Sequence, residues 1–237
     1  MIDSILVVGD VHGCFHTFRT LVEQYWQPET MLLIQLGDLT DRGNFIPETV
    51  QYARLLEQQY PSRTVFLRGN HEEMVLEVWD MVRQASVPLA ALYSRTNTTL
   101  AQYFQRSKGH SFVEDDMEWL RQRPLFWQND AIFVSHAGVS DVWSTIEESL
   151  DTTHSESIVW TRSRLKNIGK LQIIGHTPLR TGKPDIRSSE NCINIDTGAV
   201  FGISLTAIHL DLDGTVRNVF SSATHSVDYA HSSRYEY

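Results

Sequence analysis

The chain has 237 residues, the size of one large α/β domain, since such domains run to about 200–250 residues undivided. Apolar residues make up 41% of it, enough for a sizeable core. Lysine and arginine number 20 against 29 acidic residues, so the formal charge is −9, which argues against long nucleic acid as the main partner. The two cysteines, Cys14 and Cys192, are too few for a disulfide framework and fit a reducing compartment.

No segment of the sequence resembles a secretory signal or a membrane span. The apolar run near the start covers only residues 5–9, whereas a secretory core needs about 7–15 apolar residues and a span about 20. We therefore expect a cytoplasmic protein without a membrane partner.

Short apolar runs predict buried strands at residues 5–8, 31–36, 64–67, 131–134 and 171–174. Helical spacing predicts helices at 15–25 and 46–60, and residues from 72 to about 126 are expected to form a helical insertion beside the sheet. Residues 198–217 alternate in places and turn at Asp213-Gly214, which predicts a closing hairpin. We expect one catalytic domain over residues 1–220 and a loosely held tail, rich in Ser, His and Tyr, over 221–237.

The predicted strands end in a repeated pattern of small residues followed by Asp, Asn or His. Any one of these pairs could be an ordinary turn. Ligands of open α/β sheets, however, bind outside the carboxyl ends of the strands. Five strands that end in this way therefore indicate one site, formed by Asp10, His12, Asp38, Asn70, His136 and His176.

Mixed oxygen and nitrogen donors without thiolate suit manganese, iron or zinc. This set has more ligands than one ion with an open position can use. It fits two divalent ions about 3.5–4 Å apart with one bridging carboxylate. Manganese is the predicted ion, with iron or zinc as alternatives.

The order of the motifs resembles that of the calcineurin-like metallophosphoesterases: GDVHG at 9–13, GDLTDRG at 37–43 and GNHE at 69–72. The arginines in DRG at 41–43 and in RGNHE at 68–72 resemble those in the motifs of the phosphoprotein phosphatase branch. SHAG at 135–138 and GHTP at 175–178 supply two later histidine motifs. WTR at 160–162 and NIDTGA at 194–199 resemble bacterial and phage-type members.

The resemblance covers about residues 5–212 and implies a four-layer α/β/β/α sandwich. It also implies a role for each matching residue. The first ion would be bound by Asp10 and His12, both ions by Asp38, and the second ion by Asn70, His136 and His176. The family's general acid is matched by His71, the carboxylate that orients it by Asp41, and its phosphate-binding arginines by Arg42 and Arg162. One position departs from the family, which often has proline after Asp-Arg-Gly, where this chain has Asn44.

These residues together can hydrolyse a phosphate ester. Two cations that share a hydroxide lower its pKa and polarise the phosphoryl oxygens, so that a metal-bridging hydroxide attacks phosphorus. Arginines grip the remaining oxygens, and a histidine can protonate the leaving alkoxide. Neither cysteine is required.

The sequence leaves the substrate open between related enzymes. The first hypothesis is a phosphatase that hydrolyses phosphomonoesters of phosphoproteins, on Ser or Thr with Tyr as a further candidate. The alternative is a symmetrical bis(5'-nucleosyl)-tetraphosphatase or another nucleotide or RNA-end phosphohydrolase. A catalytically silent scaffold would be expected to lack at least one ligand, and the sequence lacks none of them. The partner is thus a phosphoprotein or a phosphorylated small molecule, and the oligomeric state stays open.

Overall fold

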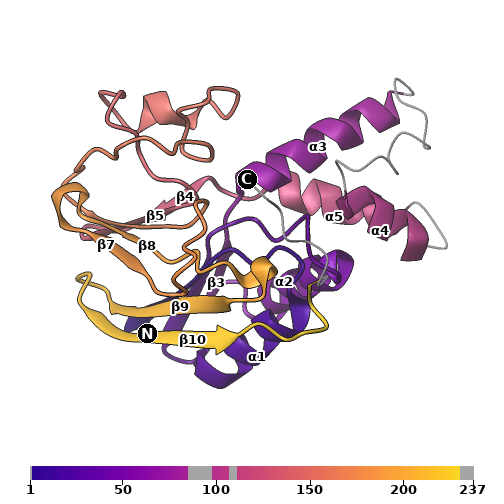
Figure 1. Ribbon diagram of the computed structural model, residues 1–237, viewed down its shortest axis with the longest axis horizontal. Coiled ribbons are helices and arrows are strands. Elements are labelled where there is room, and N and C mark those ends of the chain that lie inside the picture. The colour runs from indigo at the N-terminus through magenta and orange to yellow at the C-terminus, as the bar shows by residue number, and fades with distance from the viewer. Residues whose placement is uncertain (1, 85–97, 107–110, 230–237) are drawn as a thin grey trace.

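Two five-stranded mixed sheets pack face to face in the computed structural model, which describes residues 2–84, 98–106 and 111–229 (Figure 1). The first sheet has the order β10-β9-β1-β2-β3, with β1 at Ser4–Val8, β2 at Met31–Gln35, β3 at Thr64–Phe66, β9 at Ser204–Asp211 and β10 at Val216–Ala223. The second has the order β4-β5-β6-β8-β7, with β4 at Phe126–Gln128, β5 at Ile132–Ser135, β6 at Leu171–Ile174, β7 at Asp185–Arg187 and β8 at Cys192–Asn194.

The central strands are apolar throughout because both of their faces are covered. Along β1, Ile5 and Val7 point into the layer between the sheets, while Leu6 and Val8 point toward the helices. This alternation is the two-residue period of a strand. The layer between the sheets is completed from the second sheet by Ile132, Val134, Ile173 and Ile193. A continuous apolar run is therefore what a strand in this position requires.

Two helices, α1 at Phe15–Tyr25 and α2 at Ile46–Gln59, cover the outer face of the first sheet (Figure 1). Three more, α3 at Asn70–Arg83, α4 at Thr98–Arg106 and α5 at Ser111–Arg121, pack against one another and against α2 beside the sheet. The last three form the expected helical insertion. Residues 85–97 and 107–110 of that insertion lie outside the described residues.

The outer face of the second sheet is covered mainly by the irregular segment 136–168. Within it the described residues form one short 3-10 helix, η2 at Glu147–Leu150. Val139, Ile158 and Val159 of this segment bury their side chains against Phe133 of β5. Further 3-10 turns follow at Ser188–Glu190 (η3) and Ala199–Phe201 (η4). The predicted α/β sandwich is confirmed, with loops rather than long helices as its fourth layer.

The parallel pairings place the ends of the strands at a common edge. In the first sheet Val8 of β1 lies opposite Gln35 of β2, and in the second Val134 of β5 lies opposite Ile173 of β6. The segments that follow these four strands therefore leave the sandwich side by side. They are the segments that carry the predicted ligands.

The start of the C-terminal tail differs from the expectation. Strand β10 continues to Ala223, beyond the expected boundary at residue 220. Asp228 is fully buried, and its carboxylate accepts hydrogen bonds from the backbone N–H groups of His16 and Thr17 at the start of α1. Residues 221–229 are thus attached to the domain by strand pairing and hydrogen bonds, and residues 230–237 of the expected tail lie outside the described residues.

Among the helices that the structure describes, none combines the length and apolarity needed to cross a lipid bilayer.

The layer between the sheets provides a test of this packing. Ile173→Ala should lower the free energy of unfolding by about 2–5 kcal/mol, because Ile173 is fully buried there and truncation leaves a cavity. Ile186→Ala is the matched control, since Ile186 on β7 is 70% exposed and its truncation should cost less than about 0.5 kcal/mol. Urea unfolding of both variants measures the difference. Equal losses would contradict the assignment of the core.

Candidate metal centre and active site

The loops after five strands bring the predicted ligands into one buried cluster. Asp10 and His12 follow β1, Asp38 follows β2, and Asn70 begins α3 after β3. From the second sheet, His136 follows β5 and His176 follows β6. All six side chains belong to residues at most 5% exposed. The cluster therefore spans the edge where the two sheets meet.

The backbone of these loops is bent into conformations that side-chain-bearing residues rarely adopt. Left-handed φ angles occur at His12 (47°), Asp38 (56°), Asp41 (64°), Arg42 (71°) and His176 (68°). Such conformations cost of order 1–3 kcal/mol each and persist where the surroundings impose them. Their concentration in predicted site residues indicates that the loops are shaped for chemistry rather than for stability.

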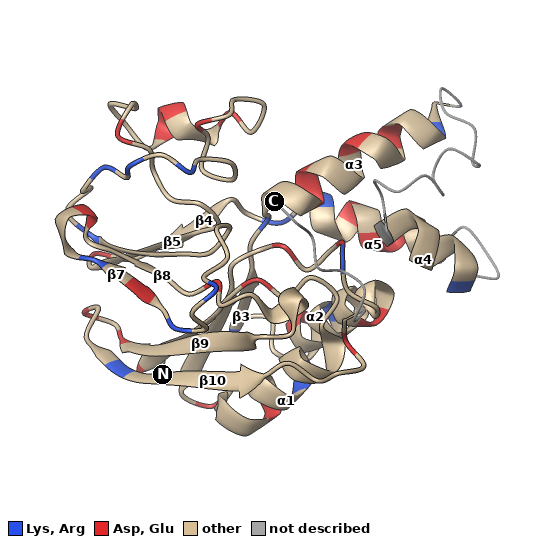
Figure 2. Ribbon diagram, in the orientation of Figure 1, with Lys and Arg blue, Asp and Glu red and all other residues tan. Residues whose placement is uncertain are grey.

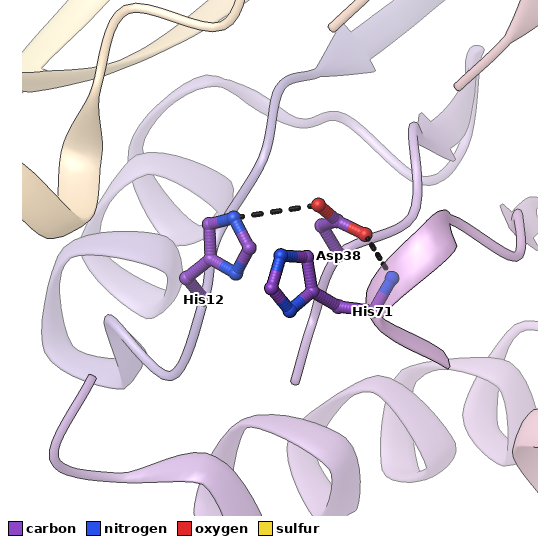
Figure 3. Close-up of side chains that lie close together, drawn as sticks. All are labelled: His12, Asp38 and His71. Carbon is purple, nitrogen blue, oxygen red and sulfur yellow. Dashed lines mark hydrogen bonds and ion pairs between the residues drawn. The ribbon is translucent and has the colours of Figure 1, made fainter. Parts of the chain in front are cut away.

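Asp38 lies at the centre of the cluster. Its Oδ2 is 3.4 Å from Nε2 of His12 and 3.4 Å from Nε2 of His136. Its Oδ1 accepts the backbone N–H of His71 at 3.0 Å, and Figure 3 shows Asp38 with its His12 and His71 contacts. Burial alone would raise the pKa of Asp38, but the neighbouring imidazoles, His136 foremost, hold it below its usual value. Asp38 is thus the carboxylate that both halves of the cluster share.

Asn70, His136 and His176 converge on the side of the second sheet. Oδ1 of Asn70 lies 2.9 Å from Nε2 of His136 and 2.9 Å from Nδ1 of His176, and these two nitrogens are 3.2 Å apart. The other ring nitrogens bind backbone carbonyls, Nδ1 of His136 at Leu36 O (3.1 Å) and Nε2 of His176 at Trp160 O (3.0 Å). Carbonyl contacts of this kind fix the tautomer of a ligating histidine.

Asp10 adds a second carboxylate with an unsatisfied oxygen. Its Oδ2 accepts the backbone N–H of His176 at 3.0 Å, whereas its buried Oδ1 has no hydrogen-bond partner within residues 2–84, 98–106 and 111–229. Burial, and then the carboxylates of Asp196 and Asp38, raise the pKa of Asp10 well above its usual value. A cation beside Asp10 would remove this cost.

Glycines make room for these carboxylates. A Cβ on Gly175 would overlap Oδ1 of Asp10, and a Cβ on Gly69 would overlap Oδ1 of Asp38. The glycines in GHT and GNH thus allow the backbone of each loop to approach a carboxylate of another loop.

The donor set fits divalent metal ions. Potential ligand atoms within 4.8 Å of one another occur in two groups that share Asp38: Asp10, Asp38 and His136, and His12, Asp38 and His71. Oxygen and imidazole ligands of this kind bind manganese, iron and zinc. Closely packed acceptors, one of them unsatisfied, are the arrangement that a pair of cations would complete.

His71 is placed differently from the other histidines because its ring is bonded to a carboxylate. Its Nδ1 is 2.8 Å from Oδ2 of Asp41, and Oδ1 of Asp41 accepts the hydroxyl of Thr99 at 2.6 Å. Burial lowers the pKa of His71, but the charge of Asp38 and the bond to Asp41 outweigh burial, and the pKa is raised. His71 can therefore carry a proton and present Nε2 to the site.

Glu72 supports the cluster, although the sequence analysis assigned it no role. Its fully buried carboxylate accepts the backbone N–H groups of Asp38 (2.7 Å), Thr40 (3.1 Å) and Gly69 (2.9 Å). Burial, and then the charge of Asp38, raise the pKa of Glu72 to about 7. It ties the loop after β2 to the start of α3. In the sequence, the GNHE motif points to Glu72, whereas no sequence pattern marks Thr99 or the carbonyl of Trp160.

The two predicted phosphate-binding arginines differ in their setting. Arg42 is half-buried, and one of its guanidinium nitrogens is 2.8 Å from Nε2 of His12. Its guanidinium carbon lies over the ring of Phe201, 5.8 Å from the ring centroid. Arg162 is exposed; burial is the main cause that lowers the pKa of His136 and His176, and the charge of Arg162 adds to it. The arginines thus lie near opposite halves of the cluster.

A groove of about 780 Å³ lies between α3 and the segment 152–162 and reaches the cluster through Trp160, whose carbonyl contacts His176. Trp160 and Arg162 line it, and the Trp160 ring lies edge-on to that of His176. Acidic side chains of α3 form the other wall, and Figure 2 shows the acidic bands along this helix. The groove could therefore hold the part of a substrate beyond its phosphate.

The cysteines take no part in this site. Cys14 and Cys192 are free and buried. Burial, and then the carboxylate of Asp228, raise the pKa of the Cys14 thiol well above its usual value, and burial raises that of Cys192 to about 12. Neither thiol is activated as a nucleophile.

Comparison with known proteins reveals relatives along most of the chain. The family model for calcineurin-like phosphoesterases matches residues 4–201. Serine/threonine-protein phosphatase 1 of Salmonella typhimurium is 29% identical over 215 residues, 85% of this chain and 89% of that protein. The asymmetrical bis(5'-nucleosyl)-tetraphosphatase PrpE of Halalkalibacterium halodurans is 28% identical over 229 residues, 85% of this chain and 88% of that protein. A protein serine/threonine phosphatase from Saccharomyces cerevisiae has a similar fold, with a TM-score of 0.69 at 15% identity over 97% of this chain and 82% of that one.

The shared position of Asp38 leads to a test by substitution. Asp38→Asn should reduce the bound metal from two ions to at most one, because the amide removes a charged ligand from both groups. Elemental analysis after loading with manganese measures the stoichiometry. Asp213→Asn is the matched control, since Asp213 lies in the β9–β10 turn and should leave the metal content unchanged. Two retained ions in Asp38→Asn would show that Asp38 does not bridge.

Proposed function

The chain belongs to the calcineurin-like phosphoesterases, hydrolases of phosphoric esters, and we propose that it releases phosphate from phosphorylated serine and threonine residues of proteins. The observation that carries this proposal is the groove beside the metal centre, whose charges suit a peptide. The phosphoprotein phosphatase motifs and the relative from Salmonella typhimurium support the same substrate class.

Members of this family use divalent metal ions, and we assign the ligands as follows. Asp10 and His12 would hold one ion, Asp38 would contribute to both, and Asn70, His136 and His176 would hold the second. When bound, the two ions supply an activated water and polarise the phosphoryl oxygens. Manganese is the ion we expect, with iron or zinc as alternatives.

The other residues of the site act on the phosphate and on the leaving group. Arg42 and Arg162 bind the phosphoryl oxygens by charge-assisted hydrogen bonds, one from each side of the cluster. His71 donates a proton from Nε2 to the departing oxygen, and Asp41 orients the ring through Nδ1. Thr99 in turn fixes the carboxylate of Asp41.

The role of His71 can be tested with two leaving groups. His71→Asn should lower kcat on an alkyl phosphate about 100-fold or more, because an alkoxide leaves poorly without a proton. The loss on an aryl phosphate should be much smaller, since a phenolate barely needs one. Equal losses on both would mean that His71 is not the acid. Elemental analysis checks that the variant still holds its metal.

The groove favours a peptide because its charges nearly cancel. Glu73 pairs with Arg68 at 2.6 Å, and Asp80 pairs with Arg121 at 2.6 Å. Among the described residues, Glu77 of α3 has no ion-pair partner and is exposed to the groove. A dinucleoside tetraphosphate would bring several further negative charges into this groove, where most of the arginine charge is already neutralised.

A bis(5'-nucleosyl)-tetraphosphatase is the second candidate, favoured by the relative from Halalkalibacterium halodurans at nearly the same identity. The deciding experiment compares kcat/KM for a phosphoserine or phosphothreonine peptide with kcat/KM for diadenosine tetraphosphate, on the manganese-loaded protein. The peptide should lead by at least tenfold, about 1.4 kcal/mol of transition-state binding. A tenfold lead of the dinucleotide would overturn the proposal.

Reversing a charge in the groove should shift this preference. Glu77→Lys should raise kcat/KM for diadenosine tetraphosphate relative to a phosphopeptide with basic flanking residues, because it replaces a repulsive charge by an attractive one. Glu29→Lys is the control, since it changes the net charge equally but lies before β2, at the opposite end of that strand from the site. Parallel effects of both variants would mean that net charge, and not the groove, sets the preference.

A further inference from the structure

The segment after β10 runs along two loops of the metal centre. We call residues 224–229 the C-terminal strap; Figure 1 shows the chain leaving β10 toward the helical side of the molecule. At its start, the hydroxyl of Thr224 donates to the carbonyl of Ala199 in η4 at 2.8 Å, and the backbone N–H of His225 donates to Thr17 Oγ1 at 2.9 Å. The strap thus joins η4 to α1.

Asp228 of the strap caps α1, the helix that follows the loop with Asp10 and His12. The N-cap residue of α1, Cys14, makes no capping side-chain hydrogen bond. The carboxylate of Asp228 accepts the N–H groups of His16 (3.1 Å) and Thr17 (2.8 Å) and the hydroxyl of Thr17 (2.6 Å) instead. A buried carboxylate at this point accepts hydrogen bonds from the first N–H groups of the helix, which have no partner within it, and interacts favourably with the helix dipole.

The backbone of the strap binds the second loop at the position where this chain departs from the family pattern. The backbone N–H of Asn44 donates to the carbonyl of Asp228 at 2.9 Å, and Nδ2 of Asn44 donates to the carbonyl of Val227 at 2.9 Å. Proline, common at this position in the family, has neither donor. Asn44 therefore replaces a residue that stiffens the loop by one that ties the loop to the strap.

These contacts bear on Arg42, two residues before Asn44. Arg42 has a left-handed φ of 71°, a strained conformation that neighbouring contacts must maintain. The N–H of Gly43 donates to His12 O at 3.0 Å, and the carbonyl of Asp228 lies against Gly43 on the strap side. Farther along, the ring of Tyr229 packs on Gly202, next to Phe201 beneath the guanidinium. The strap thus contacts Gly43, the residue after Arg42, and Gly202, the residue after Phe201.

We propose that the C-terminal strap positions Arg42 for phosphate binding, with Asp228 and Asn44 as positioning residues that do not touch the substrate. This inference rests on the phosphate-binding role of Arg42 in the proposed function. An arginine that binds the phosphate equally in the ground state and the transition state affects KM rather than kcat. Loss of the strap contacts should have the same signature.

The experiment measures binding of inorganic phosphate by calorimetry on the manganese-loaded protein, together with kcat and KM for p-nitrophenyl phosphate. Asp228→Ala should raise the phosphate Kd and the KM about tenfold, because Arg42 loses its fixed position, and should change kcat less than about threefold. Asn44→Ala, which removes one exposed hydrogen bond, should give at most about a threefold rise in Kd. Metal content should stay at the wild-type value in both variants.

A double-mutant cycle shows whether the strap acts through Arg42. In the Arg42→Ala background, Asp228→Ala should raise the phosphate Kd no further, since the group it positions is gone. Full additivity, or unchanged Kd and KM in both strap variants, would overturn the inference. So would loss of metal in Asn44→Ala, because the strap would then act on the metal ligands.

Two comparisons separate this inference from its premise. Asn129→Ala is a matched control, because Nδ2 of Asn129 also binds a backbone carbonyl, Leu212 O at 2.8 Å, but lies before β5, away from the site. It should lower the midpoint of thermal unfolding without changing the phosphate Kd. If Arg42→Ala leaves the phosphate Kd unchanged, the proposed role of Arg42 fails. If Arg42→Ala weakens binding and Asp228→Ala does not, only the strap inference fails.

Discussion

Two carboxylates, Asp10 and Asp38, are buried where the two sheets meet, and much of the surrounding structure serves to make this possible. A buried charge is costly unless it is paired or hydrogen-bonded. Asp38 is compensated by imidazoles from both sheets and by the backbone N–H of His71. Asp10 keeps an oxygen without a partner among the described residues. This incomplete compensation is the physical reason to expect cations at the centre.

The same requirement explains the strain and the supports around it. Loops that must aim ligands at one point adopt left-handed conformations at Asp38 and His176, among other residues. Such conformations persist only when neighbouring contacts impose them. Glu72 provides such contacts from α3, by accepting backbone N–H groups of the loop after β2. Chemistry and support are thus carried by different residues on the same short motifs.

In the proposed function, the groups that act on the phosphate and the groove that holds the rest of the substrate are neighbouring parts of the fold. The candidate metal ligands lie in the loops at the strand ends and, with Asn70, at the first residue of α3, where His71 follows. The groove is formed by α3 of the helical insertion and by the irregular segment that covers the second sheet. Insertions and loops of this kind can vary without disturbing the ligands, so relatives with different named activities can share one centre.

The sequence by itself determined the buried strands, the helices α1 and α2, and which polar residues follow the strand ends, because each depends on a local pattern. Apolar runs predict strands with two covered faces, and the glycine that ends most of these runs predicts a turn. Only the tertiary structure decided which distant residues support these loops. Thr99 comes from the insertion to fix Asp41, the carbonyl of Trp160 fixes the ring of His176, and Asp228 reaches α1 from the far end of the chain. No periodicity marks such residues, since a hydrogen bond between distant segments depends on how the two sheets pack and not on the residues beside it in the sequence.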